Sequence, residues 1–370
     1  MTKPGIIAIH LLNDFSGSPL VFREALEALQ GAGFKVTLFT ATPSGKGFLS
    51  DMPAVTLRPV AYRWSRNKWL TLGFFLLNQL SLFLRVAWVA GRQDIVYINS
   101  MLPFGGALAG WLKGCTVVYH IHEVSIRPAR LMQWLVFVIN RTASHCIFVS
   151  HYVRWHTAVT TGGTVIYNAL PTSFVDKCVA EGNKCPAGKE ESSFTVLMLC
   201  SLKYYKGVNE FIQCASFLPE VRFELVLNSS RRAMDIFFAG RPLPSNLRLF
   251  DAQSDTHPFF RRASVVVNLS LPDQWIETFG MTILEAMYYR KPVIVPPVGG
   301  VSELVEEGVN GFCVDSRNVE DVVGKIRLLS RDAVLYERMG SKAFDKATCF
   351  RQEVFSHLLI KTIDQLLEKQ

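Results

Sequence analysis

The sequence lacks the features that would place it in several common protein classes. Its eight cysteines form no C-x-x-C pair and no zinc-ligand spacing, and several lie in apolar runs, which is typical of a reduced, cytosolic protein. It has no G-x-G-x-x-G fingerprint, so a dinucleotide fold of the dehydrogenase type is disfavoured. The first residues lack the long apolar core and cleavage site of a signal peptide, and we do not expect export.

Charged residues are also scarce. They make up 19% of the 370 residues, against 49% hydrophobic residues, and the mean hydropathy is +0.21. This composition is apolar for a soluble protein, yet no uninterrupted, uncharged stretch has the length of a membrane span. The net charge of +8 favours an anionic partner such as anionic lipid, nucleic acid or a sugar nucleotide. No helix-turn-helix, zinc-finger or RNP signature is present, so we expect no nucleic-acid partner.

Strand-like apolar runs alternate with amphipathic helices along the chain, and this alternation predicts an α/β protein with two Rossmann-like domains. We expect an N-terminal domain over residues 1–172 and a second domain over residues 194–347. The polar, Gly- and Lys-rich composition of residues 173–193 predicts an interdomain linker. Residues 348–370 are expected to form a separate C-terminal helix.

The most informative stretch covers residues 273–315. Glu277 and Glu285 flank seven residues that include Phe279 and Gly280, and a helix is predicted from about Met281. This order places a glycine and a helix N-terminus beside a strand end, where open α/β sheets bind ligands. Free N–H groups and the helix dipole favour an anion there, so the stretch predicts a phosphate site.

The spacing Glu277-x7-Glu285, with Phe279 and Gly280 inside it, resembles the donor-site motif of retaining glycosyltransferases of family four. The resemblance implies a GT-B fold, in which two Rossmann-like domains face a central cleft and the last helix packs back on the first domain. It implies that Glu277 contacts the transferred sugar and that Glu285 binds the nucleotide ribose. Phe279 and Gly280 would offer backbone groups to the sugar and diphosphate. The alternative is a pair of ordinary solvated glutamates.

A second part of the donor site is matched less completely. Lys206 and Gly207 correspond to the family's Lys-Gly pair, which grips the donor diphosphate together with an arginine. Ser201 or Cys200 occupies the arginine position. We expect either that Lys203 supplies the missing charge or that Lys206 and helix N-termini hold the diphosphate alone.

His120 and His122 end a predicted strand and should point to the same face of the sheet. Such a pair can begin a metal site, but no further cluster at ligand spacing supports one, and we expect neither a metal nor a cofactor besides the nucleotide-sugar substrate. The resemblance implies that His122, followed by Glu123, is a catalytic polar group near the sugar or acceptor; a structural histidine is the alternative. Gly17 matches one of the family's loop glycines near the donor, with an ordinary turn as the alternative.

Residues 58–92 combine Arg and Trp with a nearly continuous apolar run. On a helix, polar residues such as Asn78 and Arg85 would share one narrow stripe, which leaves more apolar surface than packing on a sheet requires. Together with residues 127–141, a second basic and apolar element, this pattern predicts contact with a membrane surface. A helix buried between layers, or a dimer contact, is the alternative.

The resemblance implies a retaining, metal-independent hexosyl or related transferase that moves a sugar from a nucleotide-sugar to a hydroxyl acceptor. The basic, Trp-rich first domain favours a lipid-linked glycan acceptor at the inner face of the cytoplasmic membrane. Assembly of a lipopolysaccharide, O-antigen-like or capsule-like surface polysaccharide would use such an acceptor. Two other functions stay open: a GT-B-fold sugar-nucleotide epimerase, and a non-catalytic nucleotide-sugar-binding scaffold.

Overall fold

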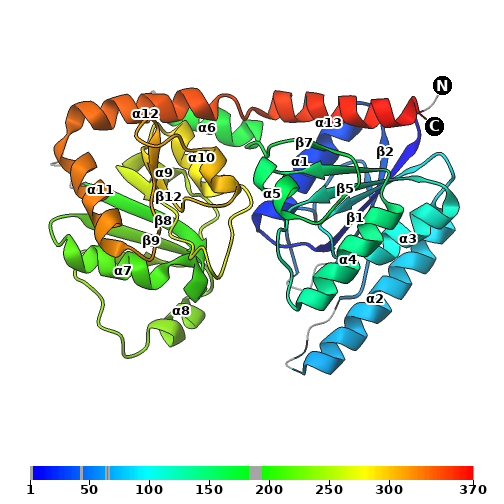
Figure 1. Ribbon diagram of the computed structural model, residues 1–370, viewed down its shortest axis with the longest axis horizontal. Coiled ribbons are helices and arrows are strands. Elements are labelled where there is room, and N and C mark those ends of the chain that lie inside the picture. The colour runs from blue at the N-terminus through cyan, green and yellow to red at the C-terminus, as the bar shows by residue number, and fades with distance from the viewer. Residues whose placement is uncertain (1–2, 42–44, 63–64, 66, 183–193, 370) are drawn as a thin grey trace. The chain divides into compact units, whose positions relative to one another are not determined.

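The computed structural model describes residues 3–41, 45–62, 65, 67–182 and 194–369 (Figure 1). The chain divides into two compact units, the first comprising Met1–Ala169 and Gln352–Gln370 and the second Leu170–Arg351. Each unit has a parallel sheet covered by helices, as the alternating pattern predicted.

The first unit contains a seven-stranded sheet in the order β3-β2-β1-β4-β5-β6-β7, with every pairing parallel. The central strands are fully buried, which explains their continuous apolar sequences. The strand order reverses between β1 and β4, and open α/β sheets bind ligands at such a switch point. The strands are β1 (Gly5–Leu12), β2 (Lys35–Ala41), β3 (Val55–Pro59), β4 (Ile95–Asn99), β5 (Thr116–Ile121), β6 (His145–Phe148) and β7 (Gly163–Val165).

The helices of the first unit include one from the far end of the sequence. Helix α13 packs against α1, and Lys3 pairs with Asp364 of α13 at 3.3 Å. The C-terminal helix therefore belongs to the unit in which the chain begins. The helices are α1 (Gly17–Gly31), α2 (Lys68–Val89), α3 (Phe104–Lys113), α4 (Ala129–Thr142), α5 (His151–His156) and α13 (Gln352–Leu367).

Helix α2 turns polar residues toward the protein together with Phe75, Leu82 and Val86, while most of its other large apolar residues point outward. Asn78 donates to the carbonyl of Ala61 at 2.7 Å, and the Gln79 side chain accepts from the amide of Gly105 on α3 at 2.9 Å. The polar stripe is therefore part of the packed face, because its amides satisfy backbone groups inside the unit. By length and composition α2 could also cross a membrane, which the sequence analysis did not recognise because Arg85 interrupts the run.

The second unit contains a six-stranded parallel sheet in the order β10-β9-β8-β11-β12-β13, with its switch point between β8 and β11. The strands are β8 (Thr195–Ser201), β9 (Arg222–Asn228), β10 (Leu247–Phe250), β11 (Val265–Val267), β12 (Val293–Val295) and β13 (Gly311–Cys313). The helices are α6 (Thr172–Gly182), η1 (Tyr204–Lys206), α7 (Val208–Phe217), α8 (Arg231–Phe238), α9 (His257–Arg262), α10 (Met281–Tyr288), η2 (Gly300–Glu303), α11 (Val319–Arg331) and α12 (Ala333–Ala347).

The expected linker over residues 173–193 needs correction in its first half. Residues 173–182 belong to helix α6, which packs on α9 within the second unit. Phe174 stacks on His257 with ring centroids 4.2 Å apart, and Cys178, one turn later, is buried. This pair at i and i+4 anchors the helix, and the polar residues around it concealed the pattern. Residues 183–193 lie outside the described part of the chain.

Candidate functional site

The predicted site residues fall into two groups, each at the switch point of its own sheet. In the second unit, Ser201 ends β8 and Ser270 follows β11, the neighbouring strand. In the first unit, Asn99 ends β4 and His122 follows β5. The topology of parallel sheets explains both positions, because the carboxyl ends of adjacent strands meet at one edge.

The centre of the group in the second unit is an ion pair between Lys206 and Glu277. The Lys206 ammonium contacts the Glu277 carboxylate, and their side chains are only 14% and 17% exposed. The Ser270 hydroxyl donates to the same carboxylate at 2.8 Å, and the Asn268 side chain also hydrogen-bonds to it. Burial alone would raise the pKa of Glu277, but the charge and hydrogen bond of Lys206 outweigh burial and hold that pKa below its usual value.

Lys206 is positioned by an aromatic ring and by a glycine. Its ammonium lies 4.7 Å from the centre of the Trp275 ring, which stacks on Tyr205 at 5.1 Å. Gly207 has a φ of +76°, and a Cβ there would lie 2.0 Å from the carbonyl oxygen of Leu269. Only glycine allows this close approach, which sets Lys206 beside the end of β11.

Residues 279 and 280 join Glu277 to helix α10. Gly280 precedes the helix with a φ of +108°, and a Cβ there would lie 2.6 Å from the Val301 side chain. The Phe279 side chain is buried, so any contact of this residue with the donor would be made by its backbone groups, as the family resemblance implies. The amide of Gly300 donates to the Glu277 carbonyl at 2.7 Å, which fixes the backbone of the acidic residue. The expected helix from Met281 is confirmed.

Glu285 lies on α10, half-buried and apart from the ion pair. Burial raises the pKa of its carboxyl to about 8. Among the described residues, no hydrogen bond or ion pair joins this carboxyl to Lys206 or Glu277. A buried carboxyl group of this kind gains hydrogen bonds when a ligand with hydroxyl groups binds beside it.

Ser201 and Lys203 lie on the loop between β8 and η1. Ser201 is half-buried, and its carbonyl accepts from the amide of Lys203 at 2.8 Å. The Lys203 side chain is exposed, and the ion pair with Glu277 is made by Lys206. Lys206 is thus the cation that the structure places within this cluster.

The group in the first unit is a network of hydrogen bonds centred on Asn99. Its Oδ1 lies 2.7 Å from Nε2 of His122. Its Nδ2 donates to the Ser18 hydroxyl at 2.9 Å and lies 3.0 Å from Nδ1 of His10. The network joins β1, β4, α1 and the segment after β5 at the switch point.

Burial shifts the pKa of each ionisable group around this network toward its neutral form. Burial lowers the pKa of His10 to about 4 and that of His120 to about 3, and it lowers the pKa of His122 well below its usual value. The rings of His120 and His122 lie 4.6 Å apart, as their spacing on one strand face predicted. Burial raises the pKa of Glu123, although the Ser100 hydroxyl donates to its carboxylate.

Gly17 lies at the start of helix α1, and its expected role near the donor stays a prediction. Gly17 is the first residue of helix α1, whereas we expected it in the loop before the helix. Its neighbour Ser18 reaches Asn99, so the side chain that connects this turn to the network belongs to the serine. Ser16, the residue before the helix, is extended, and its hydroxyl donates to Asp14 and makes no cap hydrogen bond to the helix.

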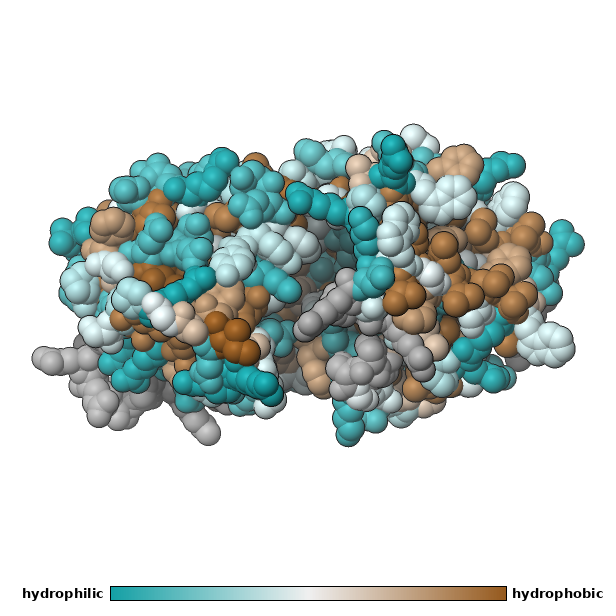
Figure 2. Space-filling view, turned by 90° about the horizontal axis from the view of Figure 1, so that it is seen from below, coloured by the Kyte–Doolittle hydropathy of each residue, from teal (hydrophilic) through white to brown (hydrophobic). Residues whose placement is uncertain are grey.

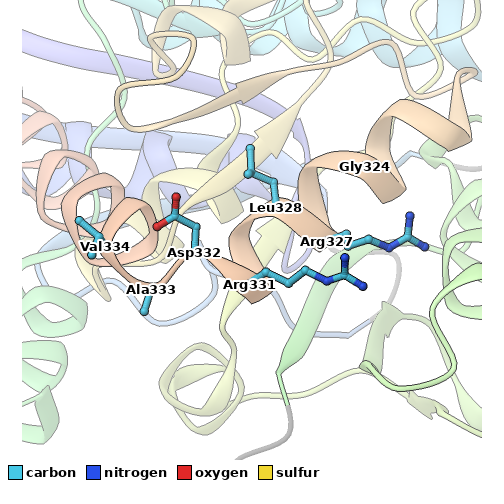
Figure 3. Close-up of a pocket in the computed structure, with 7 residues that line it drawn as sticks. All are labelled: Gly324, Arg327, Leu328, Arg331, Asp332, Ala333 and Val334. Carbon is cyan, nitrogen blue, oxygen red and sulfur yellow. The ribbon is translucent and has the colours of Figure 1, made fainter.

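Two other features of the described residues do not coincide with these groups. No cluster of three or more His, Cys, Asp or Glu side chains in the described ranges has the geometry to hold a metal ion. A surface pocket lies where α11 meets α12, and none of the predicted site residues lines it (Figure 3). It is lined by Gly324, Arg327, Leu328, Arg331, Asp332, Ala333 and Val334.

Sequence reasoning missed several residues of both groups. Asn99, His10 and Ser18 were not singled out in the first unit, nor were Asn268 and Ser270 in the second. Each lies in or just after a strand, or in the first turn of the helix that follows one. Polar residues directly after buried apolar strands were the signal that could have found Asn99 and Asn268.

Two family models match the chain. The model of Glycosyltransferase Family 4 matches residues 15–174, and that of the Glycosyl transferases group 1 matches residues 183–346. These matches fall on the two halves that the sequence predicted to be separate domains. The chain belongs to the family-four glycosyltransferases.

Curated relatives match about half of the chain. An N,N'-diacetylbacillosaminyl-diphospho-undecaprenol alpha-1,3-N-acetylgalactosaminyltransferase of Campylobacter jejuni is 25% identical over 178 residues, which are 47% of this chain and 45% of that protein. A D-inositol 3-phosphate glycosyltransferase of Paenarthrobacter aurescens is 29% identical over 176 residues, 44% of this chain and 42% of that protein. The chain thus spans less than half the length of each of these relatives.

Solved structures resemble the whole chain in fold. Anabaena Alr3699/HepE in complex with UDP has a TM-score of 0.76 at 20% identity, over 98% of this chain and 100% of that one. Sucrose-phosphate synthase from Thermosynechococcus elongatus has a TM-score of 0.77 at 18% identity, over 100% of both chains. The predicted fold class, GT-B with two parallel-sheet α/β domains, is confirmed.

Proposed function

We propose that this protein is a retaining, metal-independent glycosyltransferase that moves a sugar from a nucleotide-sugar to a hydroxyl acceptor. The observation that carries the proposal is the buried Lys206–Glu277 pair beside the N-terminus of α10. Both charges lie at the switch point of the sheet in the second unit, where an α/β fold binds nucleotides.

The reaction requires neutralisation of a diphosphate leaving group. Lys206 and the free N–H groups at the start of α10 provide positive potential for that charge. Glu277 is held ionised by Lys206, and a carboxylate accepts hydrogen bonds from sugar hydroxyls in a fixed plane. Glu285 would take the ribose hydroxyls, in keeping with its half-buried carboxyl on α10. In this proposal, protein groups neutralise the charge of the diphosphate, and no metal ion or other cofactor is needed.

Calorimetry with purified protein tests this donor site. UDP and UDP-glucose are the first probes, because solved structures of the related fold contain them, and GDP and ADP follow. We expect binding of one nucleotide that weakens about tenfold in Glu285→Gln, the loss expected when one hydrogen bond to the ribose is removed. Unchanged binding in that variant would contradict the assignment of Glu285.

Activity distinguishes the proposed transferase from its two alternatives. We expect transfer, or slow hydrolysis of the donor, that falls at least about a hundredfold in Glu277→Ala. An epimerase would instead release an altered nucleotide-sugar without any acceptor. A non-catalytic scaffold would bind the donor and show neither reaction. Circular dichroism of the variant controls for loss of folding.

We further propose that the acceptor is a lipid-linked glycan and that the protein works as a peripheral protein at the inner face of the cytoplasmic membrane, in surface polysaccharide synthesis. The distant Campylobacter relative is named for an undecaprenol-linked substrate. The support from this chain is the exposed apolar face of α2, where large side chains point away from the unit. Its members are Trp69, Leu70, Leu72, Leu76, Leu77, Leu80, Leu84, Trp88 and Val89. Figure 2 shows hydrophobic side chains gathered on the surface of the unit that contains α2.

The excess of basic residues in the first unit also supports contact with a membrane surface. Residues 52–175 contain eleven Lys and Arg but only two acidic residues, Asp94 and Glu123. Asp94 accepts hydrogen bonds from the amides of Gly5 and Gly91, and Glu123 is half-buried and accepts hydrogen bonds from the Ser100 hydroxyl and from the amides of Met101 and His122. The surplus cations would therefore meet an anionic lipid surface with little competition, each contributing roughly 1 kcal/mol.

Although α2 is long and apolar enough to span a bilayer, its packing favours an orientation in the plane of the membrane. Leu82 and Val86 are buried in the core of the unit, and Asn78 and Gln79 hydrogen-bond within it. A helix that crossed the bilayer would have to leave these contacts and expose two amides to lipid. An apolar outer face with Trp69 and Trp88 near its ends suits the interface.

Flotation with vesicles that contain anionic lipid tests the membrane surface. We expect Leu76→Gln/Leu80→Gln/Leu84→Gln to lower partition by about tenfold or more, because three exposed leucines are removed from the apolar face. Ile236→Gln is the control, since it removes one apolar side chain from the second unit that is more exposed than any of the three leucines. Unchanged partition of the triple variant would contradict this surface. Good activity on soluble acceptors, with none on a polyprenyl-diphosphate sugar, would contradict the proposed acceptor.

A further inference from the structure

We infer that Asn99 is a positioning residue that sets the tautomer of His122, with its proton on Nε2 and with Nδ1 unprotonated. The role of His122 in transfer rests on the proposed function, but its protonation state does not. The inference begins from the position of Asn99, which is fully buried at the end of β4 and lies between His122 and His10.

The two ends of the Asn99 amide have opposite hydrogen-bonding roles. Oδ1 can only accept, and it lies 2.7 Å from Nε2 of His122, so that nitrogen carries the proton. Nδ2 can only donate, and it reaches the Ser18 hydroxyl at 2.9 Å and Nδ1 of His10 at 3.0 Å. Asn99 therefore sets His122 as a donor at Nε2. Nδ1 of His10 lies near both the Asn99 side-chain nitrogen and the Asn99 backbone carbonyl, at 3.3 Å from the latter, so these contacts do not fix its tautomer.

The groups that surround the two rings oppose a positive charge. His120, on β5, lies beside His122, and its Nδ1 is 2.9 Å from the hydroxyl of Tyr97 on β4. Burial is the largest cause that lowers the pKa of His122. Electrostatic interactions with His120 and then with His10 lower it further. Burial lowers the pKa of His10 and outweighs the Asn99 carbonyl and Asp14, which both raise it. Glu123 accepts from the backbone amide of His122, and burial raises the pKa of this carboxyl group.

This arrangement differs from a histidine that serves as a general base. Such a histidine is backed by a carboxylate, which stabilises the imidazolium that forms. His122 is backed by an amide, which fixes the tautomer and supplies no negative charge. Its remaining ring nitrogen, Nδ1, is then a hydrogen-bond acceptor suited to a hydroxyl group of the sugar or acceptor.

Nitrogen NMR of the full chain, labelled with ¹⁵N-histidine and free of substrate, tests the protonation state directly. Long-range proton–nitrogen spectra between pH 5.5 and 8 report which ring nitrogen carries the proton, and His122→Gln assigns the signal. We expect one protonated nitrogen, Nε2, across the whole range. An imidazolium at pH 7, or a proton on Nδ1 alone, would overturn the inference.

Asn99→Asp tests whether the amide is the cause. The variant keeps the shape of the side chain but offers a carboxylate to both rings, so His122 should titrate within the measured range, with at least a tenfold rise in its protonated fraction at pH 7. Ser18→Ala is the matched control, because it removes a partner of Nδ2 and leaves the contact with His122 in place. An unchanged His122 signal in a folded Asn99→Asp variant would refute the role of Asn99.

The wild-type spectrum decides the tautomer even where Asn99→Asp does not fold. After a donor has been identified by calorimetry, the pH profile of transfer adds a functional measurement. We expect Asn99→Asp to acquire a new acid limb as His122 becomes charged, whereas Ser18→Ala retains the wild-type profile. If no nucleotide-sugar binds, the proposed function fails while the NMR result still decides this inference.

Discussion

The two units use the same parallel topology, but the groups at their switch points differ in charge. In the first unit, His10, His120 and His122 are neutral and Asn99 connects two of them. In the second unit, Lys206 and Glu277 are both charged and paired. We infer that the second edge is suited to a charged diphosphate and the first to uncharged hydroxyl groups.

The comparison also shows what decides the charge of a buried carboxyl group. Burial raises the pKa of Glu123, Glu277 and Glu285 alike. Only Glu277 has a lysine against it, and only its pKa lies below the usual value. Hydrogen bonds from Ser100 and from backbone amides lower the pKa of Glu123 but do not outweigh burial. The presence of a cation therefore distinguishes the switch point of the second unit, which we call the charged edge, from that of the first unit, the neutral edge.

The largest expected effect comes from removing that cation. Lys206→Met leaves Glu277 buried without its partner and should lower the free energy of unfolding by about 3 to 5 kcal/mol. The pKa of Glu277 is lower in the folded protein than its unfolded-state value of 4.5, so the ionised carboxylate stabilises the fold above pH 4.5. This stabilisation is lost as the pH falls through the folded-state pKa. In Lys206→Met this acid sensitivity should disappear. Urea unfolding between pH 3 and 7 measures both quantities.

The double variant Lys206→Met/Glu277→Gln is the control for this prediction. It removes both charges, so most of the stability lost in Lys206→Met should return. Donor binding should stay weak in both variants, because neither supplies a cation for the diphosphate. Equal instability of the single and double variants would show that packing, and not charge, stabilises this edge.

The contrast between the two edges explains which features could be predicted from the sequence. Glu277, Glu285 and the start of α10 at Met281 lie within one continuous stretch, so a local pattern identifies them. The pairing of Lys206 with Glu277 spans 71 positions and depends on β8 lying beside β11, which no local pattern specifies. For the same reason Asn99, which meets His122 across neighbouring strands, was missed.

Two local features were misjudged because polar composition concealed them. Helix α6 was interpreted as a linker, since Phe174 and Cys178 are its only strong apolar anchors in a polar segment. On α2, the sequence indicated a narrow polar stripe. It did not indicate that Asn78 would be buried and would donate a hydrogen bond to the carbonyl of Ala61. Burial of a polar side chain depends on a partner distant in sequence.

The next largest effect concerns Glu285, whose pKa of about 8 indicates a neutral carboxyl group in the folded protein. A raised pKa stabilises the fold below the unfolded value of 4.5, and this stabilisation is lost as pH rises toward 8. Glu285→Gln cannot ionise and should be more stable than the wild type at pH 8.5, by on the order of 2 kcal/mol. Thermal unfolding at pH 5 and pH 8.5 measures the difference, and equal stability of the two proteins at pH 8.5 would contradict it.

In the first unit, His120 should contribute to acid sensitivity in the opposite pH range. Its folded pKa of about 3 lies below the unfolded value of 6.5, so its contribution is present above 6.5 and is lost as pH falls. His120→Gln keeps a polar partner for Tyr97 but cannot take up a proton, and should gain about 2 kcal/mol relative to the wild type between pH 7 and pH 4.5. His156→Gln, at an exposed position, is the control and should show no such gain. Parallel stability curves for wild type and His120→Gln would contradict the neutral network.

The smallest expected effect separates the contribution of Trp275 from that of Glu277 at the charged edge. The Trp275 ring lies 4.7 Å from the Lys206 ammonium and is 40% exposed, so Trp275→Leu should lower the free energy of unfolding by about 0.5 to 1 kcal/mol beyond the loss in Trp275→Phe. Phenylalanine is the matched comparison because it keeps a ring face for the cation. The same difference measured in a Lys206→Met background should vanish, since no cation remains to interact with either ring. A difference that persists there would assign the effect to stacking on Tyr205, and the charged edge would then depend on Glu277 and Lys206 alone.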